Sequence, residues 1–196
     1  MKKLLITGFA PFGGGDVNPS WLAVQALPAR IGAFEVHKME LPTVFGEAAA
    51  QVIARADEIG AELVLSVGQA GGRDAVTPER IAVNIRDARI PDNAGNQPRG
   101  EFVAPEGPAA YFATVPVERM AQAIRDRQIR ATVSNSAGAF VCNDVMYALL
   151  HRFAGTSVKA GFIHVPYIPA QGQPNMPLEQ TVAALTAAIE ACGEER

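Results

Sequence analysis

The sequence predicts an α/β fold: a three-layer α/β/α sandwich around a mostly parallel, mixed central sheet, in a single domain over residues 1–196. Short apolar runs typical of buried strands alternate along the chain with segments of helical periodicity, which is the pattern of this fold class. The chain has 196 residues and is 48% hydrophobic, enough apolar material for one full core. No linker, internal repeat or low-complexity segment divides it.

The first sixty residues predict two strand–helix pairs. Residues 4–7 are a short apolar strand, and the Asn-Pro-Ser motif at 18–20 opens the helix that follows. Residues 34–41 predict a second strand. Residues 45–59 predict a long amphipathic helix, because their apolar side chains recur at helical spacing, and Gly60 ends it.

The middle of the chain predicts two strands and a long loop. Residues 63–68 are a continuous apolar run of the kind that parallel sheets bury on both faces. Residues 81–85 alternate between apolar and polar positions, like a further strand. Residues 87–108 are rich in Pro, Gly, Asn and Asp, and a loop of that length is usually functional or an oligomer contact.

The last third predicts helices and strands in alternation. Residues 117–129 have the pattern of a surface helix, and residues 132–134 are a strand that leads to a small-residue turn before Cys142. A helix starts at Cys142 and continues through 145–150. A strand at 159–166 and a helix at 177–192 complete the order.

Composition excludes several function classes. The net charge of -3 comes from 17 basic and 20 acidic residues without a basic block, so neither nucleic acid nor an anionic membrane is an expected partner. No segment approaches the ~20 apolar residues that span a bilayer. The two cysteines do not require a disulfide, and no His, Cys or carboxylate set has the spacing of a metal site. We therefore expect a cytoplasmic protein without a metal.

Cys142 stands where a nucleophile would stand. At a helix N-terminus, the dipole and free N–H groups favour a thiolate and can hold a developing oxyanion. The alternative is a small buried core residue, which is the commoner fate of a free cysteine. Cys192 precedes a charged tail at 194–196 and has no such setting, so we expect it to have no role.

A cysteine nucleophile needs a base, and His37, His151 and His164 are the candidates. His164 ends a buried-type strand, and catalytic groups collect at the carboxyl ends of parallel strands, so it is preferred. An acid that orients the imidazole is not selected by spacing alone. Candidate carboxylates lie in or near loops, and they are Asp74, Glu79, Asp87, Asp92 and Asp144. Glu79 stands out only because it precedes Arg80 and the strand at 81–85.

The glycine-rich loop at 8–15 lacks the residue order of a P-loop and of a dinucleotide site. Its two phenylalanines, Phe9 and Phe12, are core anchors or the walls of a slot for a flat, uncharged group.

Several segments together resemble the family of pyroglutamyl peptidase I, also called pyrrolidone-carboxylate peptidase, whose members are cysteine peptidases. The resemblance covers nearly the whole chain, and its carriers are residues 7–14 (TGFAPFGG) with 18–20 (NPS), 68–73 (GQAGGR), 79–84 (ERIAVN), 87–93 (DARIPDN), the cysteine segment 134–144 and 161–166 (GFIHVP).

The resemblance implies a catalytic triad of Cys142 as nucleophile, His164 as base and Glu79 as the orienting acid. It implies that Arg89 and the Cys142 N–H stabilise the oxyanion. The residues that it assigns to the substrate pocket are Phe9, Phe12, Asn18, Gln69, Phe140 and Val141. Where many relatives have tyrosine two residues before the cysteine, this chain has Phe140, which keeps the ring and removes a hydroxyl.

The implied function is that of an omega-type exopeptidase, which removes an N-terminal pyroglutamyl residue from peptides through a thioester acyl-enzyme. No cofactor is expected, and the resemblance favours a homotetramer or a dimer. A non-catalytic binding protein on the same scaffold is the alternative from another class, and a phosphorolytic nucleoside enzyme is more distant.

Overall fold

The computed structural model describes residues 1–193, so the charged tail at 194–196 lies outside the described residues. Its strands are β1 Lys2–Phe9, β2 Arg30–Ile31, β3 Phe34–Leu41, β4 Leu63–Gln69, β5 Thr77–Pro78, β6 Ile81–Val83, β7 Ala110–Phe112 and β8 Lys159–Val165. Its helices are α1 Pro19–Ala26, α2 Glu47–Ile59, α3 Val117–Asp126, α4 Val141–Arg152 and α5 Leu178–Gly193, with a 3-10 turn at Pro169–Gln171. The α/β fold class is confirmed.

Six strands form one mixed sheet in the order β2-β3-β1-β4-β8-β5. The four central strands are parallel, and the short edge strands β2 and β5 are antiparallel to their neighbours. Because the central strands run in one direction, their carboxyl ends meet at one edge of the sheet. Gly68 near the end of β4 is the register partner of His164 near the end of β8.

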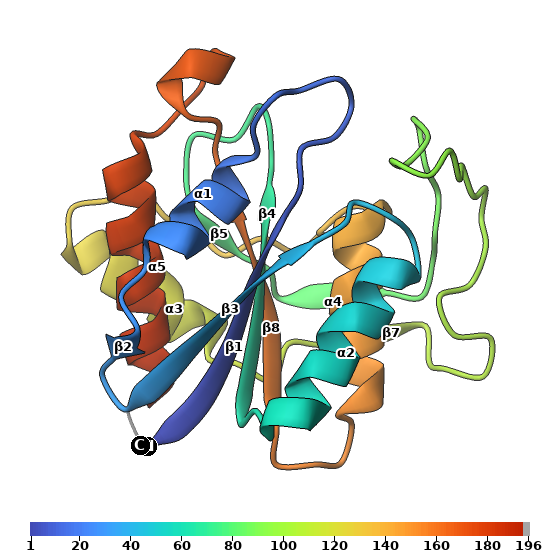
Figure 1. Ribbon diagram of the computed structural model, residues 1–196, viewed down its shortest axis with the longest axis horizontal. Coiled ribbons are helices and arrows are strands. Elements are labelled where there is room, and N and C mark those ends of the chain that lie inside the picture. The colour runs from blue at the N-terminus through green and yellow to red at the C-terminus, as the bar shows by residue number, and fades with distance from the viewer. Residues whose placement is uncertain (194–196) are drawn as a thin grey trace.

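Helices cover both faces of the sheet, as Figure 1 shows, with α1, α3 and α5 on one side and α2 and α4 on the other. Alternate residues of β1 enter the two cores, since Leu4 and Ile6 pack with the first group of helices and Leu5 with the second. Successive side chains of a strand point to opposite faces, so a strand buried on both faces is apolar throughout.

Two expected strands differ from the structure. Residues 132–134 are not a strand of the sheet, because the segment forms only isolated bridges, between Val76 and Ala131 and between Glu79 and Ser134. Thr132 is exposed, whereas Val133 packs against the core. The expected strand at 81–85 is shorter, and as β6 it pairs with β7 in a separate two-stranded sheet.

Across residues 1–193, no helix combines the length and the apolar character that crossing a membrane requires.

Candidate active site

Cys142 is the second residue of α4, which begins at Val141 and is preceded by Phe140 in an extended conformation. The first N–H that bonds back within this helix belongs to Asp144, which donates to the Phe140 carbonyl. The Cys142 N–H therefore lies in the turn where helix N–H groups have no intrahelical acceptor. Its thiol faces β4, because a Cβ added to Gly68 would lie 2.8 Å from Cys142 Sγ. Only glycine leaves room for the sulfur there.

His164 and Glu79 form a buried pair. His164 Nδ1 lies 2.7 Å from Glu79 Oε1, and the residues are 4% and 0% exposed. Glu79 follows the edge strand β5, and its backbone N–H donates to the Phe162 carbonyl of β8, which fixes it beside His164. An ionised carboxylate can only accept, so Nδ1 carries the proton and Nε2 is left as the basic nitrogen.

The sulfur of Cys142 and the ring of His164 line the same cavity, of about 670 Å³. Phe12, Gln69 and Phe140 line it too. Its lining includes residues of the loop after β1, of the loop after β4 and of the segment before α4. The structure thus brings Cys142, His164 and, through His164, Glu79 to one place.

Arg73 is part of this site, and sequence reasoning did not single it out. Its Nη1 lies 2.6 Å from Glu79 Oε1 and 2.6 Å from Thr77 Oγ1, and its Nη2 donates to the Ser136 carbonyl at 3.1 Å. Its place in the GQAGGR segment was visible, but the ion pair with Glu79 depends on how the loop folds back onto β5.

Burial disfavours the charged forms of Glu79 and His164, and the hydrogen bond between the two side chains opposes this effect. Burial alone would raise the pKa of Glu79, but the hydrogen bond and charge of His164, with the Ser134 and Arg73 side chains, hold it below its ordinary value. Burial lowers the pKa of His164 below its ordinary value, and although Glu79 opposes this, Arg73 adds to it. At neutral pH the carboxylate is ionised and the imidazole is neutral.

The thiol differs from what its helix position predicts. Burial raises the pKa of Cys142 to about 12, and the charge of Glu79 adds to the rise, while Arg73 and the Cys142 backbone N–H oppose it. The expected stabilisation of thiolate by the helix N-terminus is present in the backbone contact but is outweighed by desolvation. The two pKa shifts therefore favour a neutral thiol and a neutral imidazole on the same cavity.

The residues assigned to the substrate pocket divide into two groups. Phe12, Gln69 and Phe140 line the cavity, as does the oxyanion candidate Arg89. The Phe12 and Phe140 rings lie 6.0 Å apart, and Phe45 meets Phe140 edge-on at 5.2 Å. Gln69 Oε1 accepts a hydrogen bond from Gln171, which leaves its amide N–H groups as donors.

The other pocket candidates lie behind the cavity wall. Phe9 is 2% exposed and packs against Phe162, whose ring in turn contacts that of His164. Val141 is buried in the core. Asn18 caps α1 by accepting from the Ser20 N–H and donates to the Ala10 carbonyl, so its amide shapes the first loop.

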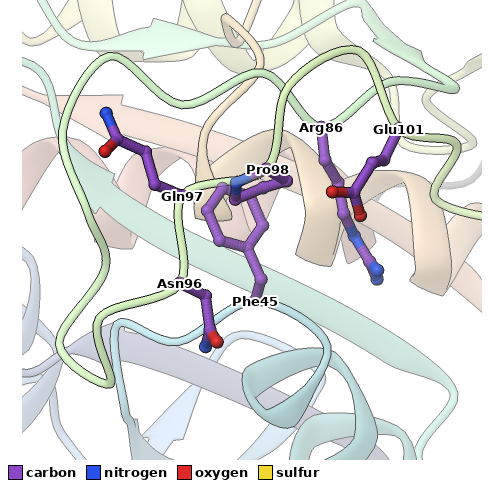
Figure 2. Close-up of a pocket in the computed structure, with 6 residues that line it drawn as sticks. All are labelled: Phe45, Arg86, Asn96, Gln97, Pro98 and Glu101. Atoms are coloured by element: carbon purple, nitrogen blue, oxygen red, sulfur yellow. The ribbon is translucent and has the colours of Figure 1, made fainter.

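A second cavity, of about 390 Å³, is lined by neither cysteine nor histidine (Figure 2). In this view Phe45 lies in the middle, with Asn96 and Gln97 on one side and Arg86 and Glu101 on the other. Arg86 is held there by buried Asp144, with Nε 2.6 Å from Asp144 Oδ1. This cavity therefore has neither a thiol nor an imidazole among its lining residues.

The remaining candidates are placed elsewhere or have structural partners. His151 Nδ1 meets the Tyr111 hydroxyl on the surface, and His37 lies in β3 beside Glu35. Asp92 accepts from the Phe45 and Asn96 N–H groups, and Asp74 pairs with Arg130 in the open. Asp87 lines the active-site cavity, but the contact to His164 belongs to Glu79.

Both cysteines are free thiols, and Cys192 lies at the other end of the sheet from Cys142. It lines a different cavity with Lys2, Phe34 and Lys159, at the amino ends of the strands. Burial raises its pKa to about 12, as for Cys142, but no histidine lines that cavity.

Comparison with known proteins gives matches over almost the whole chain. The sequence profile of the pyroglutamyl peptidase family matches residues 2–195. The pyrrolidone-carboxylate peptidase of Escherichia fergusonii is 50% identical over 196 residues, covering 96% of this chain and 92% of that protein. That of Yersinia pestis is 47% identical, with the same coverage of both chains.

Solved structures match equally well. The crystal structure of pyroglutamyl peptidase I from Bacillus amyloliquefaciens superposes with a TM-score of 0.94 at 42% identity, covering 98% of this chain and 97% of that one. The pyrrolidone carboxyl peptidase of Thermococcus litoralis gives a TM-score of 0.94 at 41% identity, with 98% and 93% covered.

Proposed function

The chain belongs to the pyroglutamyl peptidase family and is a cysteine peptidase that removes N-terminal pyroglutamate from peptides, and we propose that Cys142, His164 and Glu79 carry out this hydrolysis. One observation carries the assignment of residues. The 2.7 Å contact from His164 Nδ1 to Glu79 orients an imidazole that lines the same cavity as a thiol at a helix N-terminus. Base, orienting acid and nucleophile are the three parts of a triad.

The reaction starts from the neutral pair. His164 Nε2 takes the thiol proton as Cys142 Sγ bonds to the carbonyl carbon that links pyroglutamate to the next residue. Glu79 accepts from Nδ1 and stabilises the imidazolium that forms. The negative charge moves to the carbonyl oxygen, where the Cys142 N–H and Arg89 stabilise it.

The intermediate then collapses. The C–N bond breaks, the electron pair goes to the leaving nitrogen, and that nitrogen receives the proton from His164 Nε2. A thioester remains on Cys142. Water attacks the thioester while His164 takes its proton, the C–S bond breaks, and the sulfur regains a proton. Pyroglutamate leaves, and no cofactor takes part.

The cavity suits an uncharged first residue. Phe12 and Phe140 provide apolar ring surface, and Gln69 offers amide donors to a lactam oxygen. A pyroglutamyl group has no charged amine, so it enters such a cavity at little desolvation cost, whereas a free amino terminus would lose its hydration without a partner. Phe9, Val141 and Asn18 act from behind this wall, by holding the rings and the first loop in place.

The setting of the enzyme belongs to the same proposal. We place it in the cytoplasm as a homotetramer or dimer that acts on peptides with N-terminal pyroglutamate. The loop at 87–108 is the candidate contact between copies, and Phe102 within it is 63% exposed.

Release of a chromogenic amine from a pyroglutamyl amide tests the proposal. We expect Cys142→Ala to lose all measurable turnover, because no other cysteine among residues 1–193 lines the cavity. Cys192→Ala is the matched control and should keep wild-type rates, since its thiol lines a different cavity. Turnover that survives Cys142→Ala would contradict the proposed mechanism. A wild-type protein that binds the amide without cleaving it would favour the non-catalytic alternative.

A further inference from the structure

Arg73 joins three segments of the active site through one guanidinium group. Nη1 reaches Glu79 Oε1 and Thr77 Oγ1, both at 2.6 Å, and Nη2 reaches the Ser136 carbonyl at 3.1 Å. Thr77 lies in β5, Glu79 directly follows β5, and Ser136 belongs to the loop that leads to Cys142. A planar guanidinium can satisfy such a set, because its N–H groups point in fixed directions.

The same carboxylate oxygen serves both partners. Glu79 Oε1 meets Arg73 Nη1 at 2.6 Å and His164 Nδ1 at 2.7 Å. Glu79 is fully buried, whereas the Arg73 side chain is 31% exposed. A buried carboxylate without a cation would lose the partner that offsets its desolvation. Arg73 thus supplies the charge, and it does so from the rim of the cavity.

We propose that Arg73 is a positioning residue, which holds the Glu79 carboxylate ionised and fixed against His164 while the thiol proton moves. The inference rests on the triad proposed above and adds a fourth member to it. Arg73 acts through Glu79 and not on the scissile bond, so its loss should change how the pair titrates.

The charged and titratable groups around Arg73 are few. Glu79, His164 and Cys142 face it from the site, while Asp87 and Arg89 line the same cavity. Asp74 is the next residue in the chain, but it pairs with Arg130 at 3.5 Å in the open, where solvent screens it. The main effect of removing the Arg73 charge therefore falls on the catalytic groups.

The direction of that effect follows from the charges. The positive charge of Arg73 lowers the pKa of His164, and its hydrogen bond helps hold the pKa of Glu79 down. Without it the pKa of His164 rises. Since the base must be neutral to accept the thiol proton, the acid limb of kcat/KM then moves to higher pH.

The first experiment measures pH profiles of kcat and KM with a pyroglutamyl amide. For Arg73→Gln we expect kcat to fall by roughly tenfold, part of the 10²–10⁴ that a positioned base supplies. We expect the acid limb to rise by about one pH unit, as the loss of a neighbouring charge predicts. Arg73→Lys should return the acid limb to its wild-type pH but should not restore the full kcat. A lysine keeps the positive charge but lacks the several fixed N–H donors of a guanidinium.

Arg130→Gln is the control, since it removes a charge nearby without touching Glu79. It should leave kcat and the acid limb unchanged. An Arg73→Gln enzyme with a raised KM and an unmoved limb would mean that Arg73 contacts substrate, and it would overturn the positioning role. Wild-type kinetics in Arg73→Gln would overturn it as well.

A second measurement does not depend on activity. In a Cys142→Ala background, NMR titration of the three histidines gives the pKa of His164 directly, and adding Arg73→Gln should raise it. An unchanged His164 pKa would reject the inference even if the protein is an active peptidase. Activity that survives Cys142→Ala would instead reject the triad, so the two failures are distinguishable. Far-UV circular dichroism checks that each variant is folded.

Discussion

At Cys142, burial and the helix N-terminus act on the thiol in opposite directions. Desolvation raises its pKa to about 12, although Arg73 and the backbone N–H favour the thiolate. The raised pKa keeps the proton on Cys142 at neutral pH, and in the proposed mechanism His164 removes it during the attack. A neutral imidazole is available for this, because burial lowers the pKa of His164.

The pH profile of kcat/KM follows from these two directions. The folded-state pKa of His164 lies below its ordinary value of 6.5, so we expect the acid limb below pH 6.5 and a flat rate through neutral pH. Activity is lost as the pH falls through the pKa of His164, where the base becomes protonated. Initial rates on a pyroglutamyl amide from about pH 4 to about pH 9 give this pH profile. An acid limb above 6.5 would contradict the lowered pKa of His164, and a rate that falls as the pH rises above neutral would indicate a preformed thiolate–imidazolium pair.

The assignment of single residues shows where sequence reasoning stops. Cys142 and His164 were selected from their places at a helix start and a strand end, and the structure puts both on one cavity. Glu79 was not separable from four other carboxylates by spacing, because its contact with His164 joins residues 85 positions apart. Arg73 was missed for the same reason, since its ion pair forms only when the loop after β4 closes on β5.

At the scale of elements, β4 and α4 meet at Gly68. A Cβ there would lie 2.8 Å from Cys142 Sγ and 2.9 Å from the Phe162 ring. Glycine is required because strand and thiol approach so closely.

We therefore expect Gly68→Ala to push the sulfur away from His164 and to reduce kcat/KM by about 100-fold, the order of loss that a displacement of about 1 Å causes. It should also cost about 1–3 kcal/mol of unfolding free energy through overpacking. Steady-state kinetics and urea unfolding measure the two effects. Gly193→Ala is the control for activity, because its Cβ would crowd Phe34 at 3.2 Å, at the other end of the sheet from Cys142. Full activity in Gly68→Ala would contradict this packing.

The elements themselves were predictable where their pattern was strong. The continuous apolar runs of β4 and β8 and the helical spacing of α2 and α5 were assigned to the correct class. The segment at 132–134 was assigned wrongly, because a short β-branched run has strand propensity whether or not the sheet offers it a neighbour. β5 was missed because it has two residues, one of them proline.

At the scale of the whole molecule, a buried ion pair connects the layer of α2 and α4 to Arg86, which directly precedes the long loop at 87–108. Asp144 is 0% exposed, pairs with Arg86 Nε at 2.6 Å and accepts from the Gly46 N–H at 2.8 Å. The pair thus joins the start of α4, two residues after Cys142, to the start of α2.

Arg86→Met should cost about 3–5 kcal/mol of unfolding free energy, because it leaves the Asp144 carboxylate buried without its cation. Arg152→Met is the matched control, and Arg152 lies on α4, the helix that carries Asp144. Its ion pair with Asp57 is about half exposed and should contribute less than about 1 kcal/mol. Urea unfolding at neutral pH compares them. Equal losses in the two variants would contradict a structural role for the buried pair.

The most direct test of Cys142 as the nucleophile is covalent trapping with a pyroglutamyl chloromethyl ketone, followed by mass spectrometry of the digested protein. We predict that activity is lost as the peptide containing Cys142 gains one pyroglutamyl-methylene group, that excess pyroglutamyl amide slows both, and that Cys192 stays unmodified. Inactivation with Cys142 unmodified, or a label on another side chain, would contradict the proposed mechanism.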